Sequence, residues 1–205
     1  MKYGLFIMLI FISCNGTGNF PQVDSQKNAL NPVIPAKLVR YGDSLLHIEN
    51  GIWYEGSEPY SGMIETFFPD GIIQARQTFY QGKEEGFRNT YYINGHPESV
   101  RYYRNGEKDS VHRGWWPNGQ LRYEYHFQMG VYEGDWKEWY ASGVLMKHII
   151  YQNGKELSGK GWRENGKPYM SFVRRDGRLY GLINANLCYS LQNEKGEFVP
   201  ARVVK

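Results

Sequence analysis

The chain has few of the features that mark disulfide-stabilised, membrane-spanning or nucleic-acid-binding proteins. It contains two cysteines, Cys14 and Cys188, which are too few for a disulfide framework. Its longest apolar run, from Tyr3 to Ile12, is too short to span a bilayer as a helix. The formal net charge is only +3. This balance gives no electrostatic reason to expect nucleic acid or another polyanion as a partner.

Catalytic and metal-binding motifs are also absent from the sequence. There is no phosphate-cradling glycine-rich loop, no H-E-x-x-H pattern and no G-x-S-x-G nucleophile elbow. His47 with Glu49, and His96 with Glu98, could each share a strand face, but two such ligands do not complete a metal site. We therefore expect no catalytic residues, no metal and no cofactor, and we keep an enzyme assembled across strands only as an alternative.

The N-terminus predicts export to a bacterial cell envelope. Lys2 and the apolar run that follows it are typical of a signal peptide. The run ends in Phe11-Ile12-Ser13-Cys14, which resembles the lipobox of bacterial lipoproteins, whose cysteine receives the lipid. We expect a signal peptide over residues 1–13, lipidation of Cys14, and attachment at the periplasmic or outer-membrane face. The alternatives are an ordinary secretory signal, an uncleaved anchor, or a Cys14–Cys188 disulfide.

Residues 14–36 are rich in Asn, Gly, Gln, Ser and Pro, which predicts a flexible tether. The folded domain would then occupy residues 37–205. From Leu38 the first β pattern is irregular, as expected for a unit that caps the edge of a repeat array. Regular repeats are expected over about residues 60–177. Residues 179–205 lose the period, and we interpret them as a closing hairpin around Glu194-Lys195-Gly196.

The middle of the chain repeats itself at a step of 24 residues. The glycines that mark the step form two columns: Gly71, Gly95, Gly119 and Gly143, and Gly82, Gly106, Gly130 and Gly154. An aromatic pair precedes each glycine of the first column, for example Tyr91-Tyr92 before Gly95. A fixed period of this length indicates an array of one supersecondary unit.

The sequence of each unit predicts a β-hairpin. Dipeptides such as Asp70-Gly71 and Asn94-Gly95 stand between β-patterned runs, and this is a strong hairpin signal because glycine readily adopts positive φ. Alternation places Tyr123, Tyr125 and Phe127 on one strand face and polar residues on the other. The sequence therefore predicts an all-β domain of stacked antiparallel hairpins.

Aromatic residues are abundant, with 6 Trp and 17 Tyr. One interpretation is a binding face, because Trp, Tyr and Arg dominate interaction hot spots. The other is that a thin sheet packs its large rings on one another as a core, and both interpretations can hold together. The candidate binding residues are Trp115, Trp116, Trp136, Trp139, Arg113 and Lys137.

The repeat resembles a known family. The runs Tyr91-Tyr92-Ile93-Asn94-Gly95, Trp115-Trp116-Pro117-Asn118-Gly119 and Tyr151-Gln152-Asn153-Gly154-Lys155 are similar to the bacterial MORN-variant repeat. Proteins of this kind are often labelled toxin–antitoxin system YwqK-family antitoxins. The resemblance implies a single-layered, twisted antiparallel sheet of stacked hairpins.

Together these features favour a lipid-anchored envelope protein that binds a protein or glycan partner without catalysis. The alternatives are an antitoxin-like inhibitor of a partner protein and, third, an envelope enzyme.

Overall fold

The computed structural model describes residues 32–182, 191–192 and 198–199. Their regular structure is strand throughout, so the predicted all-β fold is confirmed. No helix in this part of the chain is long and apolar enough to cross a membrane. The predicted signal peptide, Cys14 and Cys188 lie outside the described residues.

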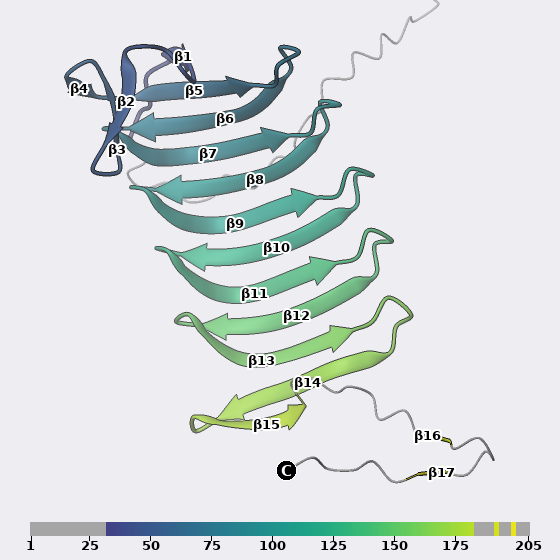
Figure 1. Cartoon of the computed structure of the whole chain (residues 1–205). Coiled ribbons are helices and arrows are strands. Elements are labelled where there is room, and N and C mark those ends of the chain that lie inside the picture. Colours follow the sequence, from purple (N-terminus) through teal and green to yellow (C-terminus); the bar gives the residue numbers. More distant parts are fainter. Residues whose placement is uncertain (1–31, 183–190, 193–197, 200–205) are drawn as a thin grey trace, which may run out of the picture.

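A sheet of twelve strands forms the body of the molecule. From β5 to β15 the strands follow one another in chain order, and each is hydrogen-bonded to its neighbours as a ladder of hairpins (Figure 1). These strands are β5 (Gly62–Phe67), β6 (Ile73–Tyr80), β7 (Lys83–Tyr91), β8 (Pro97–Arg104), β9 (Glu107–Trp115), β10 (Leu121–Gln128), β11 (Val131–Trp139), β12 (Leu145–Gln152), β13 (Lys155–Trp162), β14 (Pro168–Arg175) and β15 (Arg178–Leu182).

Two kinds of turn alternate along the ladder, and each contains one glycine column. In the turn between β7 and β8, the Asn94 carboxamide accepts a hydrogen bond from the amide of His96, and the amide of Gly95 donates to the carbonyl of Tyr92. In the turn between β8 and β9, Asn105 and Gly106 both have positive φ, 49° and 84°. All eight glycines of the two columns have φ between 73° and 86°. The repeated dipeptides therefore set the hairpin geometry locally.

The N-terminal end is built differently from the repeats. Strand β1 (Leu38–Arg40) pairs in parallel with β5 and is the edge of the large sheet. A separate small sheet contains β2 (Leu46–Glu49), β3 (Ile52–Glu55) and β4 (Glu58–Pro59). Leu46 and Trp53 of this small sheet pack on a buried cluster of Tyr60, Ile64 and Phe79. The irregular opening unit therefore covers the first strands of the ladder.

The C-terminal end of the large sheet is β15, so residues 178–182 are its last strand. Strands β12 and β14 contribute a second buried cluster of Ile149, Met170 and Phe172, on which Leu179 of β15 packs. Beyond β15, β16 (Leu191–Gln192) pairs antiparallel with β17 (Phe198–Val199). The remaining residues of the predicted closing hairpin lie outside the described ranges.

The register assigns the side chains of the large sheet to two faces. Tyr125 lies opposite His112 on β9 and Trp136 on β11, whereas Glu124 lies opposite Arg113 and Lys137. Because successive residues of a strand point to opposite sides, these two sets occupy opposite faces. We call the first the ring face, formed by His112, Tyr123, Tyr125, Phe127, Trp136 and Ile149 with their register partners. We call the second the polar face, formed by Arg113, Glu124, His126, Asp135, Lys137 and His148.

Candidate binding faces

Three rings of the ring face stack in parallel across two strands. The centroid of Tyr123 lies 4.6 Å from that of Tyr125, with an interplanar angle of 16°. Tyr125 stacks in turn on Trp136, at 4.7 Å and 9°. All three side chains are partly exposed. They form a continuous, solvent-accessible aromatic platform, which we call the ring stack.

Glycine beneath the ring stack lets it lie close to the sheet. Gly114 on β9 is buried, and a Cβ atom at this position would overlap the ring of Tyr123. Gly159 and Gly161 on β13 are covered in the same way by Phe172 and Tyr169. Large rings therefore lie over small residues of the neighbouring strand, which gives a single sheet a packed aromatic surface.

Further rings extend this surface along the ladder. Phe127 lies 4.6 Å from Tyr132, and Tyr132 lies 4.9 Å from Tyr151. On the other side, Phe127 lies 4.6 Å from the imidazole of His112. The sequence predicted that aromatic residues of neighbouring units would pack together, and these contacts have that form.

Cationic and acidic groups border the ring stack. The ammonium of Lys147 lies 5.2 Å from the centroid of Trp136, within the range of a cation–π interaction. A guanidinium nitrogen of Arg101 donates to the hydroxyl of Tyr123 at 3.3 Å. The hydroxyl of Tyr125 donates to a carboxylate oxygen of Glu138 at 2.6 Å. Burial, together with the Glu138 carboxylate, raises the pKa of Tyr125, so this hydroxyl stays protonated and remains a donor.

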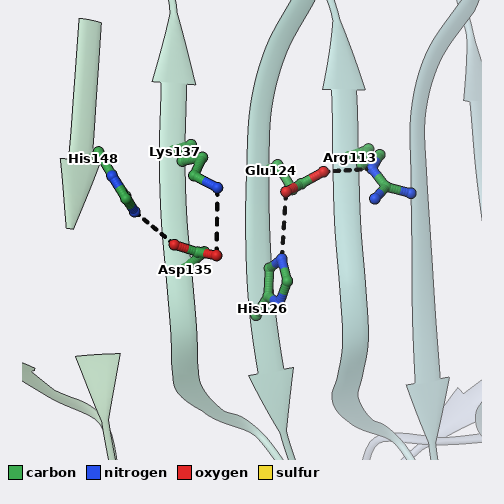
Figure 2. A network of polar contacts seen from close by, with 6 residues as sticks. All are labelled: Arg113, Glu124, His126, Asp135, Lys137 and His148. Atoms are coloured by element: carbon green, nitrogen blue, oxygen red, sulfur yellow. Dashed lines mark hydrogen bonds and ion pairs between the residues drawn. The ribbon is translucent and has the colours of Figure 1, made fainter. Parts of the chain in front are cut away.

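The polar face contains two separate ionic clusters (Figure 2). In one, Arg113 donates to Glu124 at 2.7 Å, and His126 lies 3.4 Å from the other oxygen of the same carboxylate. Burial alone would raise the pKa of Glu124, but Arg113 and His126 together outweigh it and lower the pKa. One cation and one imidazole therefore satisfy this carboxylate.

The second cluster is centred on Asp135. His148 lies 2.6 Å from one of its oxygens and Lys137 lies 3.3 Å from the other. The pKa of Asp135 is lowered, because the hydrogen bond of His148 and the charge of Lys137 outweigh a burial effect that would raise it. Within the described part of the chain, no group of three or more His, Cys, Asp or Glu side chains is arranged to hold a metal ion.

The structure separates the residues that the sequence grouped as one candidate site. Trp136 belongs to the ring stack, whereas Arg113 and Lys137 project from the polar face. The remaining predicted tryptophans, Trp115, Trp116 and Trp139, lie at strand ends beside the turns and are partly buried.

Sequence reasoning missed Tyr123, Tyr125 and Lys147 as neighbours of Trp136. Alternation along β10 already placed the two tyrosines on one face. The sequence did not reveal the register between β10 and β11, which sets Tyr125 opposite Trp136. The predicted binding site therefore grouped Trp136 with Lys137 because they are neighbours in the sequence. Neighbouring residues of a strand, however, point to opposite faces of the sheet.

The family model described as the MORN repeat variant matches residues 108–129 and 132–153. The first match covers most of β9 and all of β10, and the second covers nearly all of β11 and all of β12, so each match is one hairpin of the ladder. No curated protein matches the sequence. The chain therefore contains the MORN repeat variant at two successive hairpins, the same two that hold the ring stack.

Proposed function

We propose that this protein is a lipid-anchored scaffold of a bacterial cell envelope that binds a protein or glycan partner through its ring face, without catalysis. The observation that carries the proposal is the ring stack of Tyr123, Tyr125 and Trp136, which is partly exposed on the large sheet. Trp and Tyr provide rigid contact area at low entropic cost, and they are enriched among residues that dominate binding energy.

The ring stack is held in place before any partner arrives. Gly114 allows Tyr123 to lie close to the sheet, and Glu138 fixes the hydroxyl of Tyr125. Lys147 lies against Trp136. A surface ordered in this way loses little conformational freedom on binding, which favours affinity. Packing of the rings on one another and binding by their exposed parts are therefore compatible roles.

Adjacent residues on opposite faces provide a matched test of the ring face. Trp136→Ala should lower capture of the partner from envelope extracts at least about tenfold, because central aromatic residues often contribute more than 1 kcal/mol. Lys137→Ala changes the next residue but acts on the polar face, so capture should be retained. Circular dichroism should show the same β content in both variants. Equal capture by both variants would exclude the ring face as the binding surface.

The lipid anchor is tested separately through Cys14. Lipidation would leave the wild-type protein in the membrane fraction, whereas Cys14→Ser should move it to the soluble fraction. Cys188→Ser is the matched control, since it also removes a thiol and should leave the protein in the membrane fraction. Membrane attachment that survives Cys14→Ser would rule out the lipoprotein assignment while leaving the binding role open.

A further inference from the structure

Charge is distributed unevenly from one end of the large sheet to the other. Residues 32–70 contain two Lys or Arg and six Asp or Glu, a net charge of −4. Residues 155–182 contain seven Lys or Arg and three Asp or Glu, a net charge of +4. The segment between them is nearly neutral, with ten basic and nine acidic residues. The two ends of the ladder therefore have opposite charges of equal size.

The acidic end is exposed and partly apolar. Asp43, Glu49 and Glu58 are exposed, and none of them forms an ion pair with another described residue. Exposed apolar side chains, including Leu45 and Ile48, lie among them. Strand β1, at this edge of the sheet, is hydrogen-bonded within the described chain to β5 alone.

The basic end has the complementary character. Arg175 and Arg178 are exposed and have no ion pair within the described ranges. Beside them, Tyr180 is 50% exposed and Leu182 is 62% exposed. Among the described strands, β15 pairs only with β14, so its other edge presents backbone donors and acceptors that have no strand opposite them.

We propose that the basic end of one copy of this chain docks on the acidic end of the next, so that the protein associates head to tail. A second copy is the occupant that fits, because one chain carries both members of a charge-complementary pair: the acidic small sheet that covers the first strands of the ladder, and the basic last strands at the other end. The contact uses different surfaces on the two partners, so it generates rings or open chains of molecules and does not stop at a dimer. Such self-association is independent of the ring face and of the lipid anchor.

Paired charge reversals test the proposal on the full-length protein, purified in mild detergent and followed by sedimentation velocity over a range of concentrations. The wild type should form dimers and higher species whose population falls as NaCl rises from about 0.05 M to about 1 M, because salt screens exposed charges. The basic-end variant, Arg175→Glu with Arg178→Glu, should associate at least about tenfold more weakly. The acidic-end variant, Glu49→Lys with Glu58→Lys, should do the same.

Mixing the two variants gives the decisive measurement. Each double reversal brings the mutated end of its variant to a net charge of zero, so neither variant alone keeps a complementary pair of ends. The mixture brings the intact acidic end of one variant to the intact basic end of the other, so one-to-one complexes should form with near the wild-type affinity. Lys108→Glu with Arg122→Glu makes the same change in charge as the basic-end variant, on exposed residues of β9 and β10 in the middle of the ladder, and should leave association unchanged. A wild type that stays monomeric, a wild-type complex that stops at a dimer, or a mixture that fails to associate would each overturn the proposal.

Discussion

The indole Nε1 of Trp116 donates a hydrogen bond to the backbone carbonyl of Trp139, 3.0 Å away, and so connects one repeat to the next. The same connection recurs on either side. The hydroxyl of Tyr92 donates to the carbonyl of Trp115 at 2.7 Å, and that of Tyr140 donates to the carbonyl of Trp162 at 3.1 Å. In the aromatic pairs before Gly95, Gly119 and Gly143, the second residue therefore carries a polar atom that bonds across to the following unit, along one side of the ladder.

Removing one of these hydroxyls should weaken the array without disturbing its packing. Tyr92→Phe and Tyr140→Phe each keep the ring and lose one hydrogen bond, so each should lower the free energy of unfolding by about 1 kcal/mol. Urea unfolding monitored by circular dichroism measures the change. Tyr180→Phe is the control, because this side chain is half exposed, and it should have almost no effect. An equal loss in all three variants would contradict the role of the bonds between repeats.

His112 should make the stability of the protein depend on pH. Its side chain is 2% exposed, its Nε2 lies 2.8 Å from the carbonyl of Tyr102, and burial lowers its pKa from 6.5 to about 4. Below pH 6.5 the unfolded chain binds a proton that the folded chain does not, so the contribution of His112 is complete above this pH and is lost as pH falls toward 4. Between about pH 7.5 and about pH 5 the loss should be roughly 2 kcal/mol.

Urea unfolding at the two pH values measures this loss in the wild type and in two variants. His112→Gln should abolish most of the difference between the two pH values, whereas His96→Gln, at an exposed position, should preserve it. Glu124 and Asp135 have lowered pKa values, so the stability that they contribute is lost mainly at pH values below this window. A pH dependence that survives in His112→Gln would show that another group is responsible.

The hairpins could be predicted from sequence because their causes are local. The glycine columns impose positive φ within a few residues, and the 24-residue step repeats the same turns. The parallel pairing of β1 with β5 has no such signal, since it joins residues about 25 positions apart, and Val39 of β1 packs on the same buried cluster as the small sheet. The burial of His112 could not be predicted either. His112 occupies the repeat position that holds Trp136 in the next unit, and only the structure shows that its side chain is buried.

A second set of contacts connects the repeats at the opposite turns. A carboxylate oxygen of Glu133 accepts a hydrogen bond from the amide of Asn153 at 2.6 Å, and Glu85 makes the equivalent contact with the amide of Asn105 at 2.7 Å. Glu133→Ala should therefore speed hydrogen exchange at Asn153 by several-fold, for a loss of about 1 kcal/mol. Exchange at Asn105 is the internal control and should stay unchanged. Acceleration at both amides would indicate global destabilisation instead.

Gly114 offers a direct test of how the ring stack is seated. Gly114 does not require positive φ, so the effect of Gly114→Ala is steric, and the new methyl group meets the ring of Tyr123. The substitution should cost about 1–3 kcal/mol of unfolding free energy, the usual cost of overpacking. In a Tyr123→Ala background the same methyl group meets no ring, so its cost should fall below about 1 kcal/mol. A double-mutant cycle by urea unfolding measures the coupling. Independent, additive losses would show that Tyr123 does not rest on Gly114, and the ring stack would then lose its support.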